Sequence, residues 1–122
     1  MFVDKKMNLV NSVYQLLLGI DPNIELDEEE SKTFEDILIN LNNIENLIKE
    51  NLVNYEYERL YTIDRAIIIN CLYEIIYLKV DYKKAINKYI DITKTYSDLD
   101  DSKQHKFTNK LLDNIVTSLK LK

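Results

Sequence analysis

The chain has 122 residues and a net charge of −5, and its composition alone excludes several classes of protein. Hydrophobic residues make up 46% and charged residues 30%, as in a globular protein rather than a disordered tail or a collagen-like repeat. A single Gly and a single Pro are too few turn residues for an all-β fold and cannot build a glycine-rich phosphate loop. The length suits one domain. We therefore predict an all-α protein with a single domain, residues 1–122.

The rare residue types limit the chemistry that the chain can perform. One cysteine, Cys71, permits no internal disulfide and no thiolate zinc site, and one histidine, His105, lacks a partner at nucleophile or metal-ligand spacing. We therefore expect no enzymatic activity, no metal and no cofactor. Apolar runs reach only four or five residues, far short of the roughly 20 that span a bilayer, and the N-terminus lacks a signal-peptide pattern. This predicts a cytoplasmic protein without a membrane partner.

Charge is distributed unevenly along the chain. Residues 21–58 hold twelve acidic and two basic side chains, a net charge of −10, whereas residues 79–122 hold ten lysines and six aspartates, a net charge of +4. The acidic average therefore does not exclude a nucleic-acid partner, because the basic C-terminal half could still face a phosphate backbone.

The first predicted helix runs from about Asp4 to Leu18. Its apolar stripe, at spacings of three and four, consists of Val3, Met7, Val10, Tyr14 and Leu17. Gly19 suits the left-handed position after a helix, and Pro22 prevents the helix from resuming.

The next helical pattern is long and begins with a predicted capping box, Asp27 with Glu30. Its apolar positions are Phe34, Ile37, Leu38, Leu41, Ile44, Ile48 and Leu52. The polar pair Asn42-Asn43 is a candidate break, so the pattern fits either one helix or two.

The second half predicts a connection at 55–61 and three further helices. Thr62 is expected to cap a helix from Ile63 to about Leu78 that is apolar almost all round, which is typical of the centre of a bundle. Another helix follows around residues 85–93, and a turn at 97–102 leads to the last helix. In that helix Phe107, Leu111, Ile115 and Leu119 lie four residues apart. Together, these patterns predict a compact bundle of about five to seven helices.

Three blocks in the second half resemble a known family. The first is the segment ERLYTIDRAI at 58–67 with LYEI at 72–75, and the second is AINKYI at 85–90. The third combines Asp101-Ser102, HKFTN at 105–109 and Leu112-Asp113. Their order over roughly residues 57–116 resembles the NusB family of transcription antitermination factors.

The resemblance implies a fold and a function. The fold is an all-helical bundle of two packed subdomains, here an N-terminal part, 1–56, and a C-terminal part, 57–122. The function is non-enzymatic transcription antitermination, notably of ribosomal RNA operons. NusB proteins bind a single-stranded RNA element, boxA, together with the small-subunit ribosomal protein that doubles as NusE, and the complex joins RNA polymerase.

The resemblance also implies an RNA-binding set. It consists of Lys5, Lys6, Lys106, Phe107 and Lys110. Family members open with an arginine-rich stretch, whereas only two lysines stand there in this chain, which predicts weaker RNA binding. Phe107 has an alternative role in the core, in line with Leu111 and Ile115, and the lysines have an alternative as solvated charges. Lys103 and Gln104 are interpreted as extra residues in the turn before Phe107.

A second set, implied to face the NusE-type partner, is Tyr14, Asp64 and Asp101. Tyr14 fits equally a position in the core stripe of the first helix. Asp64 fits equally a first-turn acid that complements the helix dipole. Both alternatives stay open in the sequence.

Another function class competes with the RNA-binding adaptor. A NusB-like module that binds a protein or a second copy of itself, without RNA, agrees with the missing arginines and the isoelectric point near 4.9. The two classes differ in whether the protein binds boxA-like RNA, with or without its ribosomal partner.

Overall fold

The structure, a computed structural model, describes residues 7–96 and 103–121. These residues include five α-helices and the 3₁₀ turn η2, and they form no strand. The elements are α1 (Asn8–Leu17), α2 (Glu28–Asn51), η2 (Tyr57–Arg59), α3 (Thr62–Ile76), α4 (Tyr82–Tyr96) and α5 (Lys103–Ser118). The predicted all-α fold is therefore confirmed.

Helix α1 ends as its sequence predicts. Gly19 adopts φ +78°, and the amides of Gly19 and Ile20 donate to the carbonyls of Leu16 and Gln15, each at 3.0 Å. This double hydrogen bond is the Schellman motif, which needs a left-handed residue that glycine supplies at little cost. Gln15 then holds the following segment, because its side chain accepts from the amide of Asn23 at 3.0 Å and donates to the Asn23 side chain at 2.8 Å.

Helix α2 begins at the predicted capping box. The Glu30 amide donates to Asp27 at 2.8 Å, and the Asp27 amide donates to the Glu30 carboxylate at 3.0 Å. The helix runs without a break through the exposed pair Asn42-Asn43 to Asn51, so the one-helix alternative is correct. Ile37, Ile44 and Ile48 form its buried stripe.

Helix α3 is the centre of the bundle, as its all-round apolar pattern predicts. It packs against each of the other four helices, and Ile67 and Leu72 are completely buried. It begins one residue earlier than predicted, and the expected cap is wrong: Tyr61 precedes the helix without a side-chain cap, and Thr62 is its first residue. The Thr62 hydroxyl instead accepts from Arg65 at 3.1 Å.

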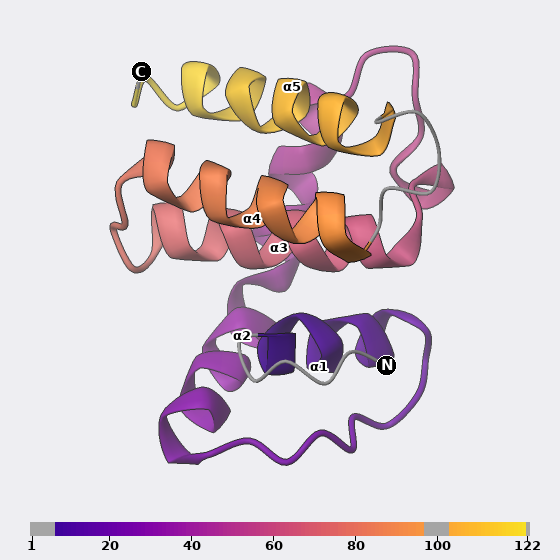
Figure 1. The fold of residues 1–122 in the computed structure, drawn as a ribbon, viewed down its shortest axis with the longest axis vertical. Helices are drawn as coiled ribbons and strands as arrows, with labels where there is room; N and C mark the ends of the chain where they lie inside the picture. The colour runs from indigo at the N-terminus through magenta and orange to yellow at the C-terminus, as the bar shows by residue number, and fades with distance from the viewer. Residues whose placement is uncertain (1–6, 97–102, 122) are drawn as a thin grey trace.

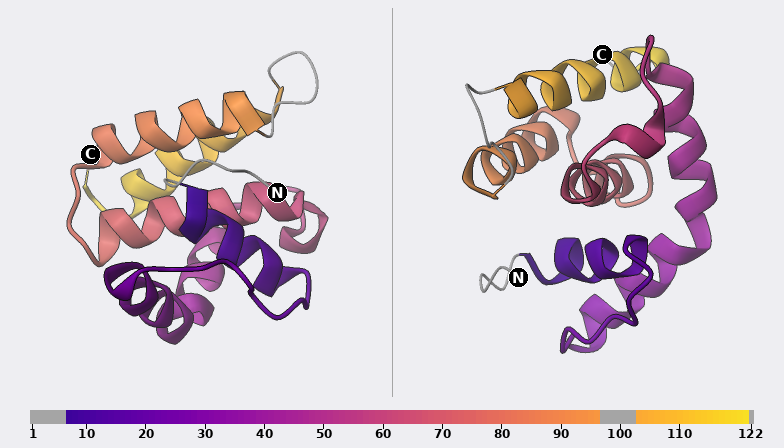
Figure 2. Two further views of the ribbon diagram at one scale, coloured as in Figure 1. Left: turned by 60° about the horizontal axis from the view of Figure 1, so that its bottom comes forward. Right: turned by 90° about the vertical axis from the view of Figure 1, so that its right-hand side faces the viewer.

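The helices form two tiers joined by α2. Figure 1 shows α3, α4 and α5 stacked together, with α1 on the opposite side of α3 from α5. Figure 2 shows α2 running along one side of the molecule from the level of α1 to the level of α5. Because α2 contacts α1, α3 and α5, it forms the edge that holds both tiers together. The predicted division at residue 56 stays a prediction.

Three tyrosine hydroxyls tie neighbouring elements through carboxylates. Tyr73 of α3 donates to Asp36 of α2 at 2.5 Å. Tyr57 of η2 donates to Glu45 of α2 at 2.7 Å, and Tyr89 of α4 donates to Glu74 of α3. Burial is the main cause that raises the pKa of each phenol, and the acceptor carboxylates add to it. The tyrosines therefore remain neutral donors at neutral pH.

Candidate nucleic-acid interface

The first two turns of α5 carry a basic stripe on their outer face. Lys103, Lys106 and Lys110 are exposed there, whereas Thr108, Leu111 and Leu112 on the other face are buried. Phe107 lies at the boundary, with 39% of its surface exposed. Phe107 is in line with the buried Leu111, as its alternative core role predicts, but it lies at the edge of the buried face of α5 rather than inside the core.

The segment that faces this stripe, residues 52–61, is anchored by Tyr57. Its ring is buried between α2 and α3, with Lys49 at 5.4 Å and Arg65 at 5.3 Å from the ring centroid. The Tyr57 hydroxyl is held by Glu45. This anchor leaves Tyr55 and Tyr61 on the surface, where both rings are exposed.

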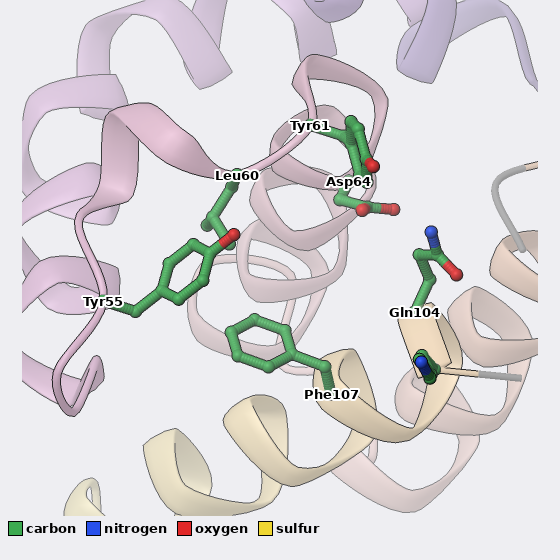
Figure 3. A pocket seen from close by; sticks show the side chains of 7 residues that line it. Tyr55, Leu60, Tyr61, Asp64, Gln104 and Phe107 are labelled. Atoms are coloured by element: carbon green, nitrogen blue, oxygen red, sulfur yellow. The ribbon is translucent and has the colours of Figure 1, made fainter. Parts of the chain in front are cut away.

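These two segments and the start of α3 enclose a pocket of about 150 Å³, here called the aromatic pocket. It is lined by Tyr55, Leu60, Tyr61, Asp64, Lys103, Gln104 and Phe107. Figure 3 shows the rings of Tyr55 and Phe107 on one side and the polar groups of Asp64 and Gln104 on the other. The ring centroids of Tyr55 and Phe107 are 5.5 Å apart with planes tilted by 51°.

The aromatic pocket has the parts of a site for an unpaired nucleobase. Exposed rings provide stacking surface for a base, and neighbouring lysines can neutralise phosphates. The Gln104 amide on the opposite wall can meet the edge of a stacked base. Among the described residues, no group of three or more His, Cys, Asp or Glu side chains is placed to hold a metal ion.

Comparison with known proteins identifies this architecture. The model of the family described as "NusB family" matches residues 5–117. The chain belongs to the NusB family. A protein named Transcription antitermination protein NusB from Bacillus licheniformis is 33% identical over 121 residues, which cover 90% of this chain and 92% of that protein. The protein of that name from Bacillus pumilus is 32% identical over 101 residues, 78% of this chain and 75% of that protein. No solved structure matched.

This NusB-family chain brings together residues from both predicted site sets. Asp64, predicted for the partner, and Phe107, predicted for RNA, line the same aromatic pocket. Asp64 is only 7% exposed and is the acid in the first turn of α3, so it also fits its alternative role at the helix dipole. Tyr14 is half-buried and packs against the core, so its alternative as a packing residue is confirmed.

Three predicted site residues lie outside the described part of the structure. They are Lys5, Lys6 and Asp101. The rest of the RNA set, Lys106, Phe107 and Lys110, lies together on the exposed side of α5.

The predicted site sets lack five residues that line the aromatic pocket, Leu60 among them. The sequence places Tyr55 and Tyr61 only in a connection, whereas both are exposed rings at the pocket. Lys103 and Gln104 were placed in a turn, which is wrong, because they are the first two residues of α5. The spacing of four between Lys103 and Phe107 is the signal that could have found them, since residues four apart share a helix face.

Cys71 of α3 is completely buried, and burial raises the pKa of its thiol. Across the described residues no helix combines the length and hydrophobicity needed to cross a bilayer.

Proposed function

We propose that this NusB-family chain is a non-enzymatic transcription antitermination factor that binds boxA-like single-stranded RNA together with a NusE-type ribosomal protein. Membership of the family and the names of the related proteins support the antitermination role. The observation that carries RNA binding is the exposed Phe107 beside Tyr55, flanked by lysines on the same helix face. The contact with RNA polymerase is then indirect, through the assembled complex.

RNA contact is divided between phosphates and bases in this proposal. Lys106 and Lys110 meet phosphates, and Lys5 and Lys6 add contacts from the N-terminus. Phe107 stacks on a base. Phosphate contacts dominate affinity for nucleic acid, so a chain with two lysines in place of an arginine-rich start binds RNA weakly on its own. The ribosomal protein supplies the missing affinity.

The protein partner docks, we propose, around the second half of α1 and the start of α3, with Tyr14, Asp64 and Asp101 in contact. Asp64 supports this because its carboxylate lines a pocket and can accept from a partner's cation or amide. Tyr14 offers an amphipathic ring whose outer side remains accessible.

Titration of a fluorescent boxA-like RNA tests the proposal. The protein is added alone and with the cognate ribosomal protein, and anisotropy is measured. We expect weak binding alone and clearly tighter binding with the partner. Binding of the ribosomal protein without any RNA affinity would instead support the competing class, a protein-binding module or homo-oligomer, which the acidic surface of residues 21–58 favours.

A further inference from the structure

A second pocket adjoins Phe107 on the side away from Asp64. It has a volume of about 320 Å³, within the roughly 300–1,000 Å³ of small-molecule sites, and lies between the end of α2 and α5. We call it the α2–α5 pocket; it is lined by Asn51, Leu52, Val53, Phe107, Lys110, Leu111 and Asn114. Phe107 is thus a wall shared by two adjacent hollows.

We propose that the α2–α5 pocket is a second nucleotide subsite, which holds the base next to the one in the aromatic pocket. The proposal rests on the RNA binding proposed above and adds residues that neither the family resemblance nor the sequence assigned. The single-stranded RNA then crosses α5 at Phe107, with consecutive bases on the two sides of that residue.

The lining suits a base better than a protein side chain or a phosphate. Leu52, Val53 and Leu111 provide an apolar floor, and Lys110 provides a cation at the same pocket. No carboxylate is among its described lining residues, although the chain as a whole is acidic, whereas Asp64 lines the aromatic pocket. An electroneutral to basic hollow beside an exposed ring is the usual environment of a bound nucleotide.

The end of α2 gives the pocket its polarity. The last carbonyl groups of a helix lack intrahelical partners and carry the negative end of the helix dipole. The Asn51 amide is fixed by donating to the Leu47 carbonyl at 2.9 Å, which leaves its oxygen to accept. These acceptors suit N–H groups, and every RNA base carries at least one on its pairing edge. The base therefore points to α2, and its phosphate lies toward Lys110.

Val53 offers a clean test because it is 78% exposed and contributes little to folding. Val53→Asp places a negative charge in the α2–α5 pocket. Ile39→Asp is the matched control, since Ile39 is 77% exposed on α2 and lines neither pocket. With the ribosomal protein present, we expect Val53→Asp to weaken binding of the fluorescent RNA at least about fivefold, the lower range for loss of one stacked base, and Ile39→Asp less than twofold.

RNAs with a single base removed at successive positions locate the effect. Wild-type protein should lose affinity at two neighbouring positions, and Val53→Asp should be sensitive at only one of them. Equal binding by Val53→Asp and Ile39→Asp, with wild-type RNA binding intact, would overturn the second subsite and leave the proposed function standing. Absence of RNA binding by the wild type with its partner would overturn both. Thermal unfolding by circular dichroism verifies that each variant is folded.

Discussion

Phe107 lies at the edge of the buried face of α5, with 39% of its surface exposed. We expect Phe107→Ala to weaken RNA binding by about 1–3 kcal/mol, the range for one base stacked on an aromatic ring. The matched control is Leu112→Ala on the buried face, which should instead lower the free energy of unfolding by about 2–5 kcal/mol. RNA titration and denaturant unfolding measure the two effects; unchanged RNA affinity in Phe107→Ala would place the bases elsewhere.

Asp64 is the residue that distinguishes partner contact from a purely structural acid. Asp64→Asn keeps the side chain's shape and removes its charge. If a cation or amide of the ribosomal protein pairs with this buried carboxylate, the affinity of that protein should fall by roughly 2–5 kcal/mol. Asp91→Asn on the exposed side of α4 is the control and should bind normally. Calorimetric titration measures both, and a normal affinity in a folded Asp64→Asn variant would assign Asp64 a structural role only.

Only part of the aromatic pocket can be predicted from the sequence. The resemblance named Phe107 and Asp64, but not that they line one pocket, because that depends on how the start of α5 meets the start of α3. The sequence does not predict Tyr55 and Tyr61 as site residues, because their exposure follows from the burial of Tyr57 between them. A local pattern cannot tell which of three nearby tyrosines is the anchor.

At the scale of elements, the start of α2 depends on its capping box. Asp27→Ala removes the side-chain acceptor of the Glu30 amide, so we expect a loss of about 1 kcal/mol in the free energy of unfolding, within the range of roughly 0.5–2. Glu28→Ala is the control, because Glu28 makes only an exposed ion pair with Lys32 at 3.5 Å. Equal losses in urea unfolding would show that the cap contributes no more than a surface charge.

The contact between α2 and α3 through Tyr73 predicts an alkaline transition. Burial, assisted by Asp36, raises the pKa of Tyr73 to about 12 from its ordinary value near 10. Because the pKa is raised in the folded state, the Tyr73–Asp36 hydrogen bond contributes its full stability below pH 10. This contribution is lost as the pH rises toward 12. We expect the free energy of unfolding to fall across this window, and to fall less in Tyr73→Phe. Tyr55→Phe, at an exposed position, is the control. If the free energy of unfolding had the same pH dependence in wild type and both variants, the Tyr73–Asp36 hydrogen bond would not contribute to stability.

Element boundaries show where sequence patterns succeed. Gly19 and the Asp27–Glu30 box predict their helix ends because each is a local device with its own hydrogen bonds. Asn42-Asn43 did not end α2, because asparagine costs less than about 1 kcal/mol in a helix and Ile44 and Ile48 pack the following turns onto the core. Tertiary packing, rather than helix propensity, therefore determines that α2 is one continuous helix.

At the scale of the whole molecule, the two oppositely charged halves meet at α2 and α5. Helix α2 comes from the acidic segment and contacts α5 from the basic one. The fold class can be predicted from composition, and the family from three sequence blocks, because neither depends on how distant segments meet in space. The pockets around Phe107 do not, because they arise between segments about 50 residues apart in sequence.

The salt dependence of RNA binding tests whether the outer face of α5 contacts the phosphates. The affinity of the boxA-like RNA is measured with the ribosomal partner present at two or more salt concentrations, for wild type and for a variant with Lys106→Ala and Lys110→Ala. The control carries Lys83→Ala and Lys84→Ala, which remove two exposed charges at the start of α4, on the opposite side of the bundle from the start of α5 (Figure 1).

Each lost phosphate contact lowers the salt slope by about 0.7 for a single strand. We therefore expect the α5 variant to bind more weakly and with a slope reduced by about 1.4, twice that value. The α4 variant, with the same change in net charge, should keep the wild-type slope. Equal affinities and slopes for wild type and the α5 variant would contradict the assignment of this face to RNA.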